Sequence, residues 1–330
     1  MTAVLEAHDL AVEYRTRKAP VRALDGVSLA VRPGEVVGVV GESGSGKSTL
    51  GAALVGAMDA AARVVAGESF LDGEPVSEMS EDELRQLRRD RLGAVFQDPI
   101  GTLDPTARIG RQMGWALDRR LSDEEGRALL AEVRLPDPAA ALRAYPHQLS
   151  GGMAQRVSIA LALAREPAAV IADEPTASLD ASIRVEILEL LVSRARERGT
   201  SVLIITHDLP AVRRFCDRVA VMYGGRIVEE ARAEVLFRAP AHPYTRALLG
   251  SALGREKPGE LVEPIQGQPP TLHGACPGCA FATRCPSAFE ACTSIRPEHH
   301  RVGDAAVLCH LYAPAPIAAG SGHESDRGEQ

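Results

Sequence analysis

The sequence lacks three features that would indicate a membrane-spanning, exported or nucleic-acid-binding protein. None of its apolar runs approaches the ~18 residues that a membrane helix needs. The chain begins Met-Thr-Ala-Val, without the basic residue and apolar core of an export signal. Its net charge is −7, so no nucleic-acid partner is expected. We therefore expect a cytosolic globular protein, whose 330 residues suffice for one large domain or two.

Cysteine is scarce except near the C-terminus. Cys216 stands alone, whereas the other five of the six cysteines lie in the last fifth of the chain. In a cytosolic protein such a cluster favours a metal or redox site over a disulfide framework. The change in composition predicts one domain over residues 1–250, a Cys-rich extension over 251–312 and a disordered tail over 313–330. Cys216 is expected to be a plain core residue.

A glycine-rich loop between an apolar strand and a helix predicts a phosphate-binding site. The loop matches the G-x-x-x-x-G-K-S pattern in its required strand-to-helix context, so an accidental glycine turn is a poor explanation. Its backbone N–H groups would surround phosphate oxygens. Lys47 would reach the β- and γ-phosphates, and Ser48 would bind Mg²⁺. The predicted nucleotide-binding residues are Gly41, Glu42, Ser43, Gly44, Ser45, Gly46, Lys47, Ser48 and Thr49.

Two later apolar strands end in polar residues that suit phosphate chemistry. Residues 169–172 lead into Asp173 and Glu174, and open α/β sheets bind ligands at this end of their strands. Asp173 would hold Mg²⁺, and Glu174 would orient the attacking water or accept its proton. An acidic turn after a strand is common, and the phosphate loop is what favours the catalytic interpretation. His207, after the run 201–206, is a candidate γ-phosphate contact, although an isolated histidine there is usually structural.

Two further segments narrow the class of phosphate-loop enzyme. Leu-Ser-Gly-Gly-Met-Ala-Gln-Arg spans residues 149–156, and Val-Phe-Gln-Asp-Pro spans 95–99. The order phosphate loop, Gln, Ser-Gly-Gly, Asp-Glu, Ser-Leu-Asp, His resembles that of ABC-type ATPases throughout. The resemblance implies an α/β phosphate-loop ATPase with a mixed core sheet, an antiparallel β subdomain and a helical subdomain over about 81–165. To these the chain adds the small Cys-rich C-terminal extension.

The Ser-Gly-Gly segment predicts a second anion site, because Ser150 and the glycines begin a helix with exposed N–H groups. The ABC resemblance implies that this signature closes over ATP held by a partner, and that Gln97 contacts Mg²⁺ and water, in a catalytic role with Lys47, Glu174 and His207. Met153 replaces a commoner glutamine, as also happens in peptide importers. The resemblance further assigns the partner's ATP to Ser150, Gly151, Gly152 and Gln155, the dimer interface to Asp180, and adenine stacking to Tyr14. An exposed tyrosine on an edge strand also has a plain structural explanation.

Beyond the ATPase core, three C-terminal segments narrow the resemblance further. Phe-Arg-Ala-Pro-Ala-His-Pro-Tyr-Thr-Arg-Ala-Leu-Leu at 237–249 precedes a proline-rich stretch at 265–270 and then the cysteines. With the core, this order resembles the oligopeptide/dipeptide/nickel importer ATPases over roughly residues 4–312. In several such importers the cysteines are implicated in an iron–sulfur cluster. The matching residues are Cys279, Cys285, Cys292 and Cys309.

The metal centre at these four cysteines has alternatives. Four thiolates suit either a [4Fe–4S] cluster or a tetrahedral Zn²⁺, and the irregular spacing favours the cluster over the paired knuckles of zinc ribbons. Unligated buried cysteines are the remaining interpretation. Cys276 forms an additional Cys-x-x-Cys pair with Cys279, without an assigned role.

The resemblance implies an ATPase that powers peptide import by an ABC transporter at the cytoplasmic face of the membrane. Two ATPase subunits, identical or related, would bind ATP and Mg²⁺ between them and act on transmembrane permease subunits. An extracytoplasmic solute-binding protein would be an indirect partner. A nickel or other small-solute importer is the alternative. A soluble ABC ATPase acting on ribosomes or DNA usually has two cassettes or a long coiled-coil insertion, which this sequence lacks, and a metal-centre assembly factor is a third interpretation. The sequence does not select the cargo.

Overall fold

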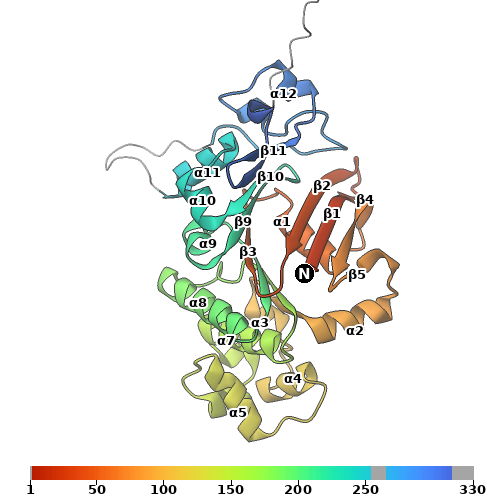
Figure 1. Ribbon diagram of the computed structural model, residues 1–330. Coiled ribbons are helices and arrows are strands. Elements are labelled where there is room, and N and C mark those ends of the chain that lie inside the picture. The colour runs from red at the N-terminus through yellow and green to blue at the C-terminus, as the bar shows by residue number, and fades with distance from the viewer. Residues whose placement is uncertain (1, 254–264, 314–330) are drawn as a thin grey trace, which may run out of the picture.

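The computed structural model describes residues 2–253 and 265–313, without the side chains of residues 181, 182, 252 and 253. The predicted tail over 313–330 lies outside this part of the chain except for Ala313. The described elements form two β-sheets with helices around them (Figure 1). The Cys-rich extension lies at the end opposite to helices α4 (Ile109–Ala116) and α5 (Asp123–Glu132) (Figure 1).

The larger sheet carries the strands that the sequence places around the ATP site. Its order in the described residues is β11-β12-β10-β9-β3-β8-β7-β6. The strands from β9 to β6 are parallel and the other three are antiparallel, so the sheet is mixed. β3 and β8 are buried along their whole length, which explains their uninterrupted apolar sequences. The bounds are β3 (Val36–Val40), β6 (Leu92–Val95), β7 (Ala169–Asp173), β8 (Ser201–Ile205), β9 (Arg218–Tyr223), β10 (Arg226–Arg232), β11 (His299–Val302) and β12 (Ala305–Leu308).

The smaller sheet is antiparallel and shares a buried core with the larger one. Its order is β2-β1-β4-β5. Helix α1 (Lys47–Leu54) places Leu50 and Leu54 in this shared core, between strands of both sheets. The predicted α/β class, with a mixed sheet and a separate antiparallel sheet, is therefore confirmed. The bounds are β1 (Leu5–Tyr14), β2 (Val21–Val31), β4 (Ala62–Leu71) and β5 (Glu74–Pro75).

The helices between β5 and β7 occupy the region predicted as a helical subdomain. Ser80 and Ser122 begin α2 and α5 with capping boxes, in which serine and the glutamate three residues later satisfy each other's backbone N–H groups. The range 81–165 also contains β6, which is an edge strand of the larger sheet. The helices here are α2 (Glu81–Arg91), α3 (Pro99–Thr102), α4, α5, α6 (Pro138–Arg143) and α7 (Gly151–Leu163), with 3-10 turns η1 (Val76–Glu78) and η2 (Pro146–Gln148).

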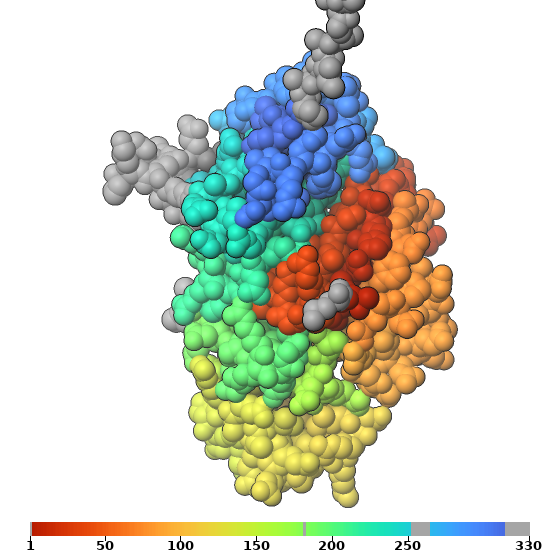
Figure 2. Space-filling view, in the orientation of Figure 1, coloured from red at the N-terminus to blue at the C-terminus, as the bar shows by residue number. Residues whose placement is uncertain are grey.

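The extension continues the larger sheet. Strands β11 and β12 form a hairpin whose Ala306 and Val307 pair with Glu230 and Glu229 of β10. The space-filling view shows the extension, in blue, covering one end of the molecule beside the C-terminal helices (Figure 2). The sequence predicts few regular elements there. In the structure, the backbone of the hairpin pairs with the edge of β10 that does not face β9. The remaining elements are α8 (Ala181–Glu197), α9 (Leu209–Phe215), α10 (Ala233–Arg238), α11 (Pro243–Leu253), η3 (Ala282–Arg284), α12 (Glu290–Ser294) and η4 (His310–Tyr312).

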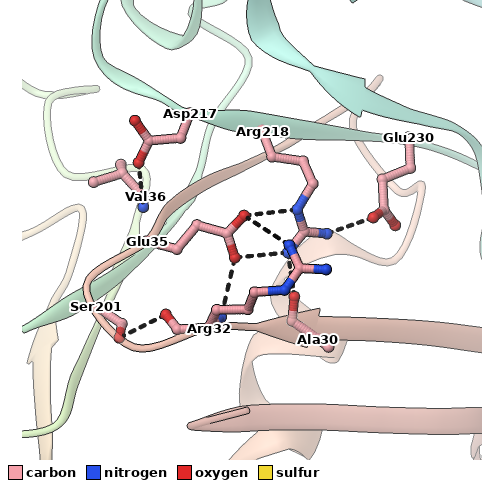
Figure 3. A network of polar contacts seen from close by, with 8 residues as sticks. All are labelled: Ala30, Arg32, Glu35, Val36, Ser201, Asp217, Arg218 and Glu230. Atoms are coloured by element: carbon pink, nitrogen blue, oxygen red, sulfur yellow. Dashed lines mark hydrogen bonds and ion pairs between the residues drawn. The ribbon is translucent and has the colours of Figure 1, made fainter. Parts of the chain in front are cut away.

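A polar network fixes the start of β3, the strand that leads into the phosphate loop (Figure 3). The guanidinium of Arg218 donates from Nε and Nη2 to the two oxygens of Glu35 at 2.8 and 2.9 Å, and also pairs with Glu230. Although burial alone would raise the pKa of Glu35, the bonds from Arg218 keep it below its usual value. Asp217 accepts the N–H of Val36 at 2.9 Å. The β2–β3 loop is thereby tied to β9 and β10 (Figure 3).

Candidate functional site

The phosphate loop connects β3 to α1 and needs glycine at two close approaches. Gly41 has φ 155°, and a Cβ there would lie 2.2 Å from Met222 O. Gly46 has φ 102°, and its Cβ would lie 2.5 Å from Ala23 O. Either side chain would displace backbone, so the glycine pattern follows from the packing around the loop. The loop is consequently held close to β2 and β9.

Lys47 is folded back onto the loop that precedes it. Its Nζ donates to Gly41 O at 2.8 Å and to Glu42 O at 3.0 Å. Burial lowers the pKa of Lys47, and the nearby carboxylates of Glu174, Asp173 and Glu42 oppose that shift. The ammonium group therefore stays near the carboxylates at the strand ends, inside the same site.

A cavity of about 590 Å³ opens at the phosphate loop. Its volume is in the usual range for small-molecule sites. The cavity brings together the loop and the polar ends of β7 and β8, which are far apart in sequence. Its lining residues are Ala23, Ser43, Gly44, Gly46, Lys47, Ser48, Thr49, Gln97, Glu174, Ala177 and His207.

Glu174 has a strained backbone and two polar neighbours. Its φ of 46° lies in the left-handed region, which a non-glycine residue adopts at a cost. Its Oε1 lies 2.8 Å from His207 Nδ1, and its Oε2 accepts from Thr206 Oγ1 at 3.2 Å. The carboxylate is thus oriented from the end of β8 and faces the cavity with His207.

Asp173 has the features of a ligand to a hard cation. Its Oδ1 is buried without a hydrogen-bond partner in the described part of the chain. Burial raises the pKa of Asp173, against a hydrogen bond from Ser48, and the charge of Glu174 adds to the increase. A buried carboxylate oxygen without a partner, beside a serine hydroxyl, fits the oxygen ligands that Mg²⁺ prefers.

The signature residues lie at the N-terminus of α7. Ser150 is the N-cap and accepts the N–H of Met153 at 3.3 Å. Ser150 and Gly151 are exposed, and the signature does not line the cavity of its own chain. The side chain of Gln155 is fully buried in this chain and donates to Phe96 O at 3.5 Å, beside the Gln97 segment. Its contact with a partner's ATP stays a prediction.

The three remaining predicted site residues, Gln97, Asp180 and Tyr14, lie in different places. Gln97 lines the cavity, and its carbonyl accepts from Ser178 Oγ at 3.0 Å. Asp180 is exposed at the start of α8. Tyr14 lies at the end of β1, where its Oη is 3.3 Å from Thr49 Oγ1, outside the set of cavity-lining residues. Tyr14 therefore adjoins α1 and does not itself border the cavity.

Four cysteines of the extension come within electrostatic range of one another. Burial raises the pKa of Cys279 to about 11, and the neighbouring Cys309, Cys292 and Cys285 add to the increase. Within residues 2–253 and 265–313, no group of three or more His, Cys, Asp or Glu side chains is placed to hold a metal ion. The structure therefore gives no support to the predicted metal centre. Cys276 instead donates to Gly278 O at 3.4 Å.

Cys216 is a core residue, as predicted. It is buried among apolar side chains and lies close to Gly38, and burial strongly raises the pKa of its thiol. A thiol in such surroundings is unreactive.

Several residues of the site were not predicted from the sequence. Ala23 and Ala177 border the cavity, but alanine has no functional group that would indicate such a position. Thr206 holds Glu174, and Tyr244 and Arg284 both bond to Glu42. The last two belong to the C-terminal segments that resemble importers, yet nothing in their spacing indicates residue 42 as their target.

Hydrolysis of a nucleoside triphosphate requires backbone N–H groups that bind phosphate, a carboxylate that can hold Mg²⁺ and a base near the attacking water. The phosphate loop, Asp173 and Glu174 match these three requirements. The fold and the site therefore define a phosphate-loop ATPase. None of the helices in the described ranges is both long and apolar enough to span a membrane.

Comparison with known proteins narrows this class. The ABC transporter family matches residues 24–177, and the oligopeptide/dipeptide transporter C-terminal region matches 228–292. Over 93% of its length the chain is 40% identical to the dipeptide transport ATP-binding protein DppD of Haemophilus influenzae, of which it covers 95%. It is 39% identical to the oligopeptide transport ATP-binding protein OppD of Escherichia coli, over 89% of each chain.

A solved structure supports the same assignment. The ATP-binding cassette MJ0796, in a dimeric post-hydrolysis state with ADP and Pi, is 31% identical with a TM-score of 0.62. The match covers 69% of this chain and 98% of that one. The chain therefore belongs to the ATP-binding proteins of oligopeptide and dipeptide ABC transporters, and it is an ATPase.

Proposed function

We propose that this chain hydrolyses ATP to drive import of dipeptides or oligopeptides through a membrane permease. The observation that carries the proposal is the similarity to a dipeptide transport ATP-binding protein over 93% of the chain, extension included. Lys47, Glu174 and His207 line one cavity, and Asp173 directly precedes Glu174, as a working ATPase requires. A nickel or other small-solute importer is the alternative cargo assignment.

The polar residues in and beside the cavity have proposed tasks in hydrolysis. The loop N–H groups and Lys47 bind the β- and γ-phosphates, and Glu174 orients the water and takes its proton. His207 contacts the γ-phosphate and holds Glu174. Ser48, Asp173 and Gln97 are the proposed ligands of Mg²⁺, which when bound neutralises phosphate charge. Adenine stacking on Tyr14, whose Oη lies 3.3 Å from Thr49 Oγ1, remains a proposal.

Dimerisation would complete the site. Ser150 and Gly151 are exposed at a helix N-terminus, and Gly152 is next to them, so the signature is available to a phosphate of another subunit. Asp180 is exposed at the N-terminus of α8 and is the proposed interface residue. The partner is an identical or related ATPase. The dimer would act on permease subunits at the cytoplasmic face of the membrane, with a solute-binding protein as an indirect partner.

Uptake measurements test the transport function. Deleting the gene from its source cell should abolish accumulation of radiolabelled dialanine or trialanine, and the wild-type gene should restore it. The Glu174→Gln gene should not restore uptake, whereas Glu68→Gln, at an exposed position on β4, should. Loss of radiolabelled nickel uptake with normal peptide uptake would favour the alternative cargo. Normal uptake of all three solutes would contradict a role in importing them.

The predicted [4Fe–4S] cluster, with Zn²⁺ as the alternative, also remains a proposal. What favours the cluster is the irregular spacing of the four cysteines, which lacks the paired knuckles of zinc ribbons. The measurement is the iron, sulfide and zinc content of the full chain purified without oxygen. About four iron and four sulfide ions per chain, lost in Cys285→Ser, would support the cluster. Stoichiometric zinc would support the alternative, and absence of both would leave the cysteines unligated.

A further inference from the structure

Arg284 reaches from the extension to the phosphate loop. Its Nη1 donates to Glu42 Oε2 at 2.6 Å and its Nη2 to Glu42 Oε1 at 3.1 Å, across 242 residues of sequence. The side chains are 4% and 26% exposed. Bidentate arginine–carboxylate pairs are the strongest and most directional of ion pairs. Because this one is largely shielded from water, salt screens it less than a surface pair.

Every N–H group of the Arg284 guanidinium has an acceptor. Besides the two bonds to Glu42, Nη1 donates to Tyr223 Oη at 3.1 Å. Nε donates to Gln266 O at 2.8 Å, and Nη2 to Ile265 O at 3.1 Å. A guanidinium has five N–H groups in a fixed fork, and all five are used here. The side chain is therefore held in one orientation, which a lysine could not reproduce.

The backbone of Glu42 connects the Arg284 ion pair to Lys47, which lines the ATP cavity. Its N–H donates to Tyr244 Oη at 2.9 Å, and its carbonyl accepts from Lys47 Nζ at 3.0 Å. Lys47 lines the cavity, whereas Glu42, Tyr244 and Arg284 do not. The position of the Glu42 peptide thus sets where the Lys47 ammonium group rests.

We propose that Arg284 is a positioning residue for the ATP site. By clamping Glu42 from the extension, it preorganises the phosphate loop and Lys47 for the phosphates of ATP. The extension, although far from the phosphate loop in sequence, then helps to position that loop. Preorganised groups bind without the cost of ordering them at the moment of binding.

The turn that carries Arg284 lies between two of the clustered cysteines. Ala282 N donates to Cys279 O at 3.0 Å, and Cys285 N to Ala282 O at 3.4 Å. Arg284 ends η3 directly before Cys285. A rearrangement at Cys279 or Cys285 would therefore move the guanidinium and alter nucleotide affinity through Glu42.

The test is the nucleotide affinity of the full-length Arg284→Lys variant. Lysine keeps the charge but loses the bidentate fork, so we expect the Kd for MgATP to rise about tenfold. The loop binds the phosphates in ground and transition states alike, so kcat at saturating ATP should change less than about threefold. Equilibrium titration with a fluorescent ATP analogue and steady-state kinetics separate the two effects.

The matched control is Arg296→Lys. Arg296 also anchors the extension, donating to Asp25 O at 2.6 Å, but has no contact with the phosphate loop. It should leave MgATP affinity unchanged even if thermal stability falls. Glu42→Gln should weaken binding in the same way as Arg284→Lys, and the double variant should be no weaker than the poorer single variant. Glu42→Gln also carries the test if Arg284→Lys does not fold. Affinities within twofold of wild type, or additive effects in the double variant, would overturn the proposal.

Discussion

ATP hydrolysis by the Glu174→Gln variant is expected to fall about 10²–10⁴-fold, with MgATP affinity close to wild type. Glutamine matches glutamate in size and can still accept the bond from Thr206, so the geometry around the cavity should survive. It cannot take a proton from the attacking water at neutral pH. The loss should therefore appear in kcat, measured as phosphate release at saturating MgATP, and not in the Kd measured by nucleotide titration.

A second glutamate provides the control for this variant. Glu68 is exposed on β4 and does not border the ATP cavity, so Glu68→Gln should hydrolyse ATP at the wild-type rate. If Glu174→Gln kept more than about a fifth of wild-type kcat, another group would have to be the base. His207 would then be the next candidate, because its ring adjoins the same cavity.

Sequence alone predicts the parts of the site that are local in the chain. The phosphate loop is one continuous segment between a strand and a helix, and its glycines, lysine and serine keep their order in space. Asp173 and Glu174 were placed correctly at a sheet edge because parallel strands end on the same side. Such features depend on short-range geometry, which residue spacing records.

Contacts between distant segments could not be predicted in this way. Tyr244 and Arg284 meet Glu42 only because the extension folds back onto the core. The β11–β12 hairpin is short and half exposed, so its pairing with β10 has no strong sequence pattern. The burial of Gln155 depends on how α7 packs against the Gln97 segment, which the signature pattern does not specify.

Several long-range contacts join the extension to the ATPase core, and two of them lead to predictions. One is the clamp of Arg284 on Glu42, beside the ATP cavity. The other is centred on Arg226 of β10, which pairs with Asp25 of β2 within the core and also donates to Gly278 O and Cys276 O of the extension. The side chains of Arg226 and Asp25 are 2% and 3% exposed. The first predicts an effect on nucleotide affinity, and the second predicts an effect on folding.

Arg226→Met is expected to lower the free energy of unfolding by about 3–5 kcal/mol, because it removes the buried partner of the Asp25 carboxylate and leaves only the half-exposed Arg296, 3.5 Å away. Arg226 donates to Asp25 Oδ2 from Nε at 2.9 Å and from Nη2 at 2.6 Å. It also donates to Gly278 O and Cys276 O at 2.9 and 2.6 Å. Removing it takes away both side-chain hydrogen bonds to Asp25 Oδ2 and the Arg226 donors to two carbonyls of the extension. Urea denaturation of the full chain measures the loss.

Two comparison variants separate the buried charge from the general loss of an arginine. Arg232→Met breaks an exposed pair with Asp304, whose side chains are 64% and 58% exposed, and should cost about 0–1 kcal/mol. Adding Asp25→Leu to Arg226→Met should recover part of the loss, since the unpaired charge is then gone. Burial alone would raise the pKa of Asp25, and Arg226 is what keeps it low. The cost of Arg226→Met should therefore shrink as the pH falls and Asp25 takes up a proton. A cost no larger than that of Arg232→Met would contradict the prediction that Arg226 stabilises the buried Asp25 charge.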